Sequence, residues 1–203
     1  MDKKKTIAVI CILAGIVCLM IPIYNHFKSA RDTEKLIEEF TKQVEEKQDE
    51  ETTGEEEEQT AISEEDAAIF SEGDVIAILE IEALGIHYPV MEGATSDNLN
   101  KAIGHLPETA GIGEIGNCVL AGHNGSRYGT FFTHLNEISK GDLVTLMNVE
   151  GEVFCYEVTD FYVVGPYDNS IKDQGEEAQL TLFTCAEKGS MRFVVKCVLK
   201  EDE

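Results

Sequence analysis

Positively charged residues are scarce in this sequence, and their scarcity excludes one broad class of function. The chain has 16 Lys and Arg against 39 Asp and Glu, which gives a formal net charge of −23 at pH 7. A protein that binds nucleic acid needs a basic surface for the phosphate backbone, and no stretch beyond residue 73 offers one. We therefore expect no nucleic-acid partner. The sequence also lacks an internal repeat, so no repeat architecture is expected.

Charge of either sign is absent from residues 7–24, an apolar run that follows Lys3, Lys4 and Lys5. As a helix this run would cover about 27 Å, close to the ~30 Å hydrocarbon core of a bilayer. The lysines place the N-terminus in the cytoplasm. A cleaved signal peptide is the alternative, but its apolar region is usually only ~7–15 residues long. We expect residues 1–28 to be an uncleaved single-pass anchor in the cell membrane, with the rest of the chain extracytoplasmic.

Apolar residues are sparse in residues 29–72, which are rich in Glu, Gln, Lys and Thr. Such a segment cannot bury enough surface to fold alone. Ile37, Phe40 and Val44 recur at helical spacing, so a short helix is compatible with the pattern. We expect an acidic stalk or linker between the anchor and a domain formed by residues 73–203.

Short strand patterns, and few helical ones, follow residue 73. They cover residues 75–81, 86–91, 118–121, 143–146, 153–164, 180–184 and 192–199. In the last of these, Phe193, Val195 and Cys197 share one face because side chains alternate along a strand. Several short strands at close spacing predict a mainly β fold, a closed or nearly closed barrel with short helices.

Cysteine chemistry singles out one residue. Of the 6 cysteines, Cys11 and Cys18 lie in the apolar run. The cysteines Cys118, Cys155 and Cys197 sit in the middle of strands, where a free Cys behaves as a small hydrophobic residue. Cys185 instead ends a strand and precedes a polar turn. It is our candidate nucleophile.

Arg192 begins the strand that follows Cys185. If the two strands form a hairpin, Arg192 lies beside Cys185, because paired strands are about 4.8 Å apart. A guanidinium there would favour the reactive thiolate and could hold a developing oxyanion. The alternatives stay open at this point: a solvated charge for Arg192 and a disulfide for Cys185.

A general acid is needed to protonate a leaving amine, and His is the usual choice. His26 lies near the apolar run, His87 lies in a strand, His105 follows Gly104 in an expected loop, and His134 lies in an expected short helix. His123 follows a glycine at the end of a strand, where a side chain can overlook a groove. An ordinary structural role is the alternative for each of these histidines.

Two stretches of the chain resemble the sortase family. Leu120-Ala121-Gly122-His123-Asn124, followed by Thr130-Phe131-Phe132, is similar to the stretch around the sortase catalytic histidine. The segment Thr181-Leu182-Phe183-Thr184-Cys185, followed by Arg192, resembles the TLxTC…R signature. The order His, Cys, Arg also matches, and the resemblance covers roughly residues 73–200.

The resemblance implies an eight-stranded sortase barrel in which His123, Cys185 and Arg192 are catalytic. It implies that the Cys185 thiolate cleaves an LPxTG-like sorting signal between Thr and Gly, and that the thioacyl intermediate passes to an amine of a peptidoglycan precursor or to a pilin lysine. Thr184 resembles a family threonine that helps to position the substrate. Further candidates for substrate binding, chosen from their positions, are Ala121, Asn124, Val164, Ile171 and Val194.

The sequence lacks the distinguishing features of two sortase classes. Residues 165–179 are too short for the helix-containing insertion of class B enzymes, and residues 29–73 contain no Pro, so the lid motif of class C enzymes is absent. The resemblance therefore favours a class A or D type.

We expect no cofactor. Some class A members bind Ca²⁺, and oxygen donors occur at Glu108, Glu114, Asp168, Asp173, Glu176 and Glu177, but we favour solvated loop charges.

Two other functions compete with this interpretation. An L,D-transpeptidase would have Arg two residues after its cysteine, where this chain has Glu187. A non-catalytic extracellular β-barrel binding module would use its cysteines in disulfides. The segment Leu106-Pro107-Glu108-Thr109-Ala110 resembles a sorting signal, but it lies in the middle of the domain rather than near the C-terminus.

Overall fold

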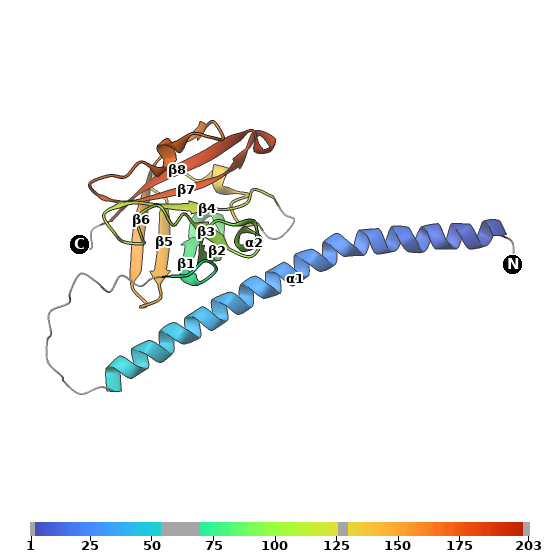
Figure 1. The fold of residues 1–203 in the computed structure, drawn as a ribbon, viewed down its shortest axis with the longest axis horizontal. Coiled ribbons are helices and arrows are strands. Elements are labelled where there is room, and N and C mark those ends of the chain that lie inside the picture. Colours follow the sequence, from blue (N-terminus) through green and yellow to red (C-terminus); the bar gives the residue numbers. More distant parts are fainter. Residues whose placement is uncertain (1–2, 54–69, 126–129, 201–203) are drawn as a thin grey trace.

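The computed structural model describes residues 3–53, 70–125 and 130–200 (Figure 1). Eight strands close into a barrel in the order β1-β2-β3-β4-β7-β8-β6-β5. The strands are β1 (Val75–Ile81), β2 (Ile86–Glu92), β3 (Ile103–His105), β4 (Gly116–Ala121), β5 (Leu143–Asn148), β6 (Val153–Val164), β7 (Ala178–Ala186) and β8 (Met191–Leu199). The expected mainly β barrel is confirmed.

Helices are few in the part of the chain that the structure describes. The two α-helices are α1 (Lys3–Thr53) and the single turn α2 (Ser96–Leu99). Four 3-10 turns are η1 (Glu82–Leu84), η2 (Leu135–Glu137), η3 (Asn169–Lys172) and η4 (Glu187–Gly189). The turn α2 ends at Leu99, and β3 begins at Ile103.

The barrel interior is filled by aliphatic and aromatic side chains at alternate strand positions. Leu79 and Ile81 of β1, and Leu180 and Leu182 of β7, are fully buried in one cluster. Burying a side chain of this kind contributes about 1.5–3 kcal/mol. On β8, Val195 and Cys197 join this cluster, as the predicted strand face requires.

The strand pairing that positions the site is the parallel pairing of β4 with β7. These strands lie far apart in sequence but run side by side, with Ala121 opposite Phe183. Because parallel strands end at the same edge of a sheet, the residues that follow them meet there. His123 and Cys185 each lie two residues beyond this last pair.

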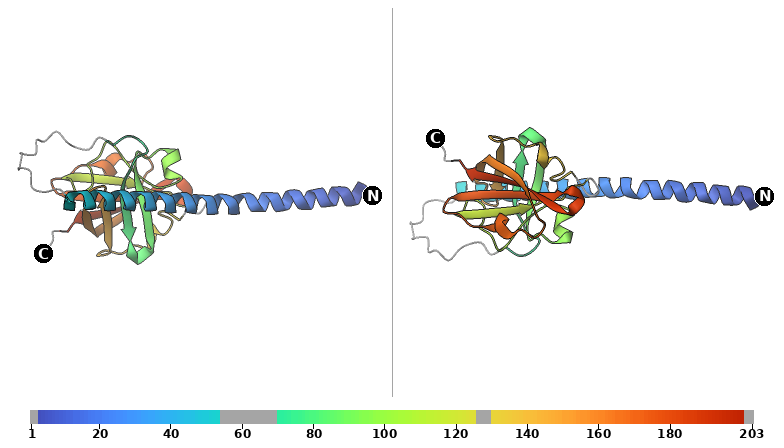
Figure 2. Two further views of the ribbon diagram at one scale, coloured as in Figure 1. Left: turned by 90° about the horizontal axis from the view of Figure 1, so that it is seen from below. Right: turned by 90° about the horizontal axis from the view of Figure 1, so that it is seen from above.

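The helix α1 is longer than the sequence pattern predicted, and its second half packs on the barrel. Figure 2 shows α1 on the side of the barrel opposite β7 and β8. Phe40 and Val44 are buried against Ile78 of β1, and the Thr33 hydroxyl donates to the Lys101 carbonyl at 3.0 Å. The apolar side chains that recur at helical spacing thus pack against the barrel. Part of the expected stalk is in contact with the domain that it precedes.

Within the described residues, no helix combines the length and apolar character needed to span a bilayer. Most side chains of the run 7–24, on which the predicted anchor depends, are outside the described part of the structure, as are residues 54–69 of the predicted linker. The anchor therefore stays a prediction.

Candidate active site

Cys185 and Arg192 face each other across the β7–β8 hairpin. They are direct partners in the antiparallel register, so their side chains lie on the same face with Cβ atoms roughly 4.5–5.5 Å apart. This is the arrangement that the sequence predicted. Cys185 is half-buried, and it is a free thiol, as are Cys118, Cys155 and Cys197. The described structure thus gives no support to a disulfide at Cys185.

The guanidinium of Arg192 is held against the hairpin loop. Its Nη1 donates to the Gly189 carbonyl at 3.0 Å and to the Met191 carbonyl at 2.9 Å. A guanidinium carries five N–H donors in a rigid plane, and these two contacts need only the pair on Nη1. These two bonds do not need the remaining three N–H donors, so those donors could bind a further acceptor.

His123 follows β4 and is placed by contacts of the glycine before it. The amide of Gly122 donates to the Phe183 carbonyl at 3.1 Å, and the Thr184 hydroxyl donates to the Gly122 carbonyl at 2.7 Å. A Cβ atom on Gly122 would lie only 2.5 Å from Cδ2 of Phe132. Only glycine lets the chain pass this close to the aromatic ring before it presents His123.

The His123 ring lies in a partly apolar setting. Its ring meets Phe131 edge-on, with centroids 6.4 Å apart. Burial lowers the pKa of His123 below its ordinary value, because the charged imidazolium loses water contacts. The ring is therefore mainly neutral at pH 7 and can accept a proton.

Phe131, which contacts this histidine, packs in turn against Tyr88, a residue to which the sequence did not point. The rings of Tyr88 and Phe131 are tilted by 35° with centroids 4.8 Å apart, and the Tyr88 hydroxyl lies 2.8 Å from the Thr130 hydroxyl. Phe131 has a φ of 35°, a left-handed conformation that is uncommon for a residue other than glycine. Tyr88 lies in β2, far from His123 in the sequence, so no local pattern indicates this role.

Asn124 links the histidine loop to the cysteine strand directly. Its Nδ2 donates to the backbone carbonyl of Cys185 at 2.7 Å. Together with the Thr184–Gly122 bond, this contact joins the residues on both sides of His123 to the end of β7. His123, Cys185 and Arg192 are thereby brought to one edge of the barrel.

Two hollows adjoin this edge. A groove of about 610 Å³ is lined on one wall by Leu106 and Pro107, on the other by Tyr167 and Ile171, and includes Arg192. A second hollow of about 410 Å³ contains Cys185 and Asn124. Tyr167 is 93% exposed although it lines the groove.

The predicted substrate-binding residues are placed unevenly. Ile171 lines the groove and Asn124 lines the smaller hollow. Thr184, Ala121 and Val194 are buried. Val164 is half-buried and pairs with Arg192 across β6 and β8. The groove-lining Leu106, Pro107, Tyr167 and Phe183 were not proposed from the sequence, although Leu106 and Pro107 belong to the LPETA segment noted there.

Three of the six acidic residues considered for calcium have other partners. The Lys172 ammonium contacts Glu108 at 2.5 Å, which joins the loops on either side of the groove and lowers the pKa of the Glu108 carboxyl. Glu114 accepts from the Gly111 amide, and Asp168 accepts from the Ser170 amide. In the described ranges no three His, Cys, Asp or Glu side chains gather as metal ligands would.

An eight-stranded closed barrel with a free cysteine opposite an arginine at one edge defines a narrow class of protein. The sortase domain model matches residues 79–200. The chain therefore belongs to the sortase family, and the features that argue against class B and class C are consistent with an A- or D-like member.

Individual relatives agree with this assignment. Sortase D of Bacillus subtilis (strain 168) is 36% identical over 114 residues, 56% of this chain and 55% of that protein, so the match spans just over half of its length. Sortase A of Bacillus anthracis is 27% identical over 201 residues, 96% of this chain and 95% of the relative. The structure of a Clostridium perfringens sortase D5 transpeptidase is 29% identical, with a TM-score of 0.65, and the match covers 85% of this chain and 98% of that one.

Proposed function

We propose that this protein is a membrane-anchored cysteine transpeptidase that cleaves an LPxTG-like sorting signal between Thr and Gly and transfers the acyl group to an amine. One observation carries the proposal: Cys185 and Arg192 are direct strand partners, and contacts of Thr184 and Asn124 hold the His123 loop against that hairpin.

The first half-reaction forms an acyl-enzyme. Neutral His123 takes the thiol proton of Cys185, and the sulfur attacks the carbonyl carbon of the threonine. The carbonyl oxygen becomes an oxyanion, which receives N–H donors from Arg192. When the intermediate collapses, the C–N bond breaks and His123 gives its proton to the departing glycine amine. A thioester to Cys185 remains.

The second half-reaction reverses these roles. An amine of a peptidoglycan precursor or a pilin lysine attacks the thioester, and His123 accepts a proton from that amine. Arg192 again holds the oxyanion. The C–S bond breaks, an amide forms, and the cysteine leaves as a thiol or thiolate, so that the enzyme is restored.

The groove suits the apolar start of such a signal. Leu106, Ile171 and Phe183 supply apolar surface, while Arg192 lies at the same groove and next to Cys185. We place the Leu-Pro part of the signal in this groove and its threonine carbonyl beside the sulfur.

We further propose that residues 1–28 anchor the protein in the cell membrane, that residues 29–72 link the anchor to the catalytic domain of residues 73–203, and that this domain works outside the cytoplasm. The basic N-terminal flank and the uncharged run 7–24 support this topology. A protease-protection assay on intact cells should digest the barrel but leave the N-terminus. A barrel that stays protected until the cells are lysed would overturn the topology.

The function is tested with the full-length protein in detergent, a panel of fluorescent LPxTG-type peptides and a set of candidate amines. Replacing Cys185, His123 or Arg192 by Ala should each lower kcat/KM at least about hundredfold. Cys155→Ala is the matched control, because Cys155 is also a half-buried free thiol. Full activity in Cys185→Ala would remove the nucleophile and, with it, the proposal.

A further inference from the structure

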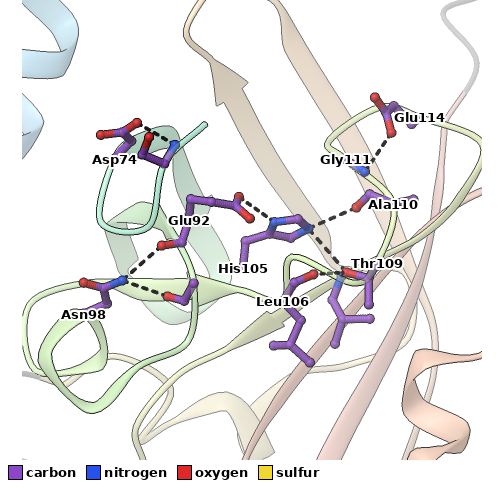
Figure 3. Close-up of polar contacts among 12 residues, drawn as sticks. Asp74, Glu92, Asn98, His105, Leu106, Thr109, Ala110, Gly111 and Glu114 are labelled. Carbon is purple, nitrogen blue, oxygen red and sulfur yellow. Dashed lines mark hydrogen bonds and ion pairs between the residues drawn. The ribbon is translucent and has the colours of Figure 1, made fainter. Parts of the chain in front are cut away.

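Glu92 and His105 form a buried pair that the proposed reaction does not use. They are 9% and 5% exposed, and they are direct partners in the parallel β2–β3 register. The Nδ1 atom of His105 lies 2.8 Å from Oε2 of Glu92 (Figure 3). A buried ionisable pair is costly unless its hydrogen bonds are satisfied, so the pair calls for a role.

The second ring nitrogen faces the turn that follows β3. His105 Nε2 lies 3.1 Å from the Ala110 carbonyl and 3.3 Å from the Thr109 hydroxyl. The Thr109 hydroxyl gives its own hydrogen to the Leu106 carbonyl at 2.7 Å, so toward His105 it can only accept. A carbonyl oxygen is also only an acceptor. Nε2 must therefore carry a hydrogen.

The hydrogen on Nε2 determines how many protons His105 and Glu92 hold together. With a hydrogen on Nε2, a neutral ring has a lone pair on Nδ1, which would face a carboxylate oxygen at 2.8 Å. A hydrogen has to lie between them, either on Nδ1 or on the Glu92 carboxyl. The pair consequently holds one proton more than a neutral imidazole beside an ionised carboxylate.

Loss of that shared proton should loosen the turn. A neutral ring has one N–H, and a carboxylate is a stronger acceptor than a carbonyl. The ring would then donate from Nδ1 to Glu92 and turn a bare lone pair toward Ala110 and Thr109, which are both acceptors there. The contacts that fasten the turn to β3 would be lost.

The fastened turn forms a wall of the groove. Leu106, Pro107 and Glu108 line it, and the turn closes through the Thr109 amide, which donates to the Leu106 carbonyl at 2.9 Å. Figure 3 shows the His105 ring between Glu92 on one side and Thr109 and Ala110 on the other. A change at the ring therefore acts on the groove without touching Cys185.

We propose that Glu92 and His105 are positioning residues for the peptide groove, and that the single proton they share holds the Leu106–Ala110 turn in the shape that binds the sorting signal. The inference rests on the proposed function. It adds a coupling between proton occupancy and peptide affinity.

Other ionisable groups near the pair do not replace it. Glu108 acts on His105 through space, but its carboxylate is paired with Lys172. The Cys118 thiol of β4 lies near Glu92, and burial raises its pKa far above the neutral range, so it stays uncharged. Glu114, which acts on the same thiol, is bound to the Gly111 amide. Asp74 accepts from the Ser71 amide.

The decisive experiment compares wild type with His105→Ala and Glu92→Gln. A glutamine can donate from its amide to Nδ1 of a neutral ring while Nε2–H still fastens the turn. The KM for the best sorting-signal peptide should rise about fivefold in His105→Ala, the effect of one lost hydrogen bond, whereas the Glu92→Gln KM should stay within about twofold of wild type. The kcat of both variants should match wild type, because Cys185 and His123 are unchanged.

Glu137→Gln is the matched control, since Glu137 makes the same 2.8 Å contact to His134 on the surface. It should keep the wild-type KM. A wild-type KM in His105→Ala, or a raised KM in Glu92→Gln, would overturn the inference. If His105→Ala does not fold, the KM of Glu92→Gln still decides.

A second measurement does not depend on activity. In ¹⁵N NMR spectra of the full-length protein at neutral pH, the His105 ring should show a protonated Nε2. A bare Nε2 at neutral pH would refute the inference even if the enzyme cleaves its peptide. If no peptide is cleaved but the spectra are as expected, the proposed function fails and the proton pair stands.

Discussion

Asn124 donates from Nδ2 to the backbone carbonyl of Cys185 at 2.7 Å. The residue after the proposed acid–base histidine is thus bonded to the proposed nucleophile itself. With the Thr184–Gly122 bond on the other side of His123, this contact makes the histidine loop and the end of β7 one unit. Four predictions follow from this edge of the barrel and from the helix packed on its far side.

Asn124→Ala should lower kcat/KM about tenfold, because losing one positioning hydrogen bond lets the histidine loop drift away from the sulfur. The measurement is the initial rate of peptide cleavage over a range of peptide concentrations. Asn148→Ala is the control, since the Asn148 side chain bonds to Glu152 in the β5–β6 turn. Unchanged kcat/KM in Asn124→Ala would show that Thr184 alone holds the loop.

Gly122→Ala should destabilise the fold by about 1–3 kcal/mol, the cost of overpacking a filled site. The added Cβ would lie 2.5 Å from Phe132 and 2.9 Å from Ile103, and neither side chain has free space. Urea denaturation gives the free energy of unfolding. Gly165→Ala is the control, because a Cβ there meets nothing within 4 Å. Equal stability of the two variants would argue against this packing.

The free energy of unfolding should depend on pH through His123. Burial lowers the pKa of the folded ring, so below the ordinary histidine pKa of about 6.5 the unfolded chain binds a proton more readily than the folded one. Stability contributed by the neutral ring is complete above pH 6.5 and is lost as pH falls toward the folded pKa. Denaturation curves from pH 5 to 8 should show this loss.

The comparison that isolates the effect is His123→Gln, which should flatten the slope in that window. If His123→Gln keeps the full wild-type slope, another group is responsible for it.

Phe40→Ala should destabilise the docked half of α1 by about 2 kcal/mol or more, since it leaves a cavity in a buried apolar contact. Phe40 is 2% exposed and packs with Val44 against Ile78. Limited proteolysis should cut the helix faster in this variant. Lys42→Ala, a change at a side chain that is 74% exposed, should digest at the wild-type rate. Equal rates in both would mean that the helix is not held by Phe40.

Local features of the chain were predictable. The Cys185–Arg192 pair depends on a short hairpin, and the turn between the two strands is visible in the sequence. The helix through Phe40 and Val44 likewise follows from helical spacing. Its contact with Ile78 does not, because spacing identifies an apolar face but not the surface that covers it. For the same reason the sequence did not predict the burial of Ala121 and Val194, which were candidates for substrate binding and are buried.

His105 illustrates the contacts between distant segments, which the sequence did not predict. It was expected in a loop, and it is the last residue of β3, where the parallel pairing with β2 places it opposite Glu92. A three-residue strand is too short to show an alternating pattern. No residue near His105 in sequence indicates that a glutamate in another strand is its partner.

By itself, the amino-acid sequence determined the class of fold, the residues with reactive chemistry and their order along the chain, because alternation, turns and motifs are short-range properties. Only the tertiary structure decided which of these residues meet. The parallel pairing of β4 with β7 brings His123 to Cys185, and this pairing depends on the packing of the whole barrel rather than on any local pattern.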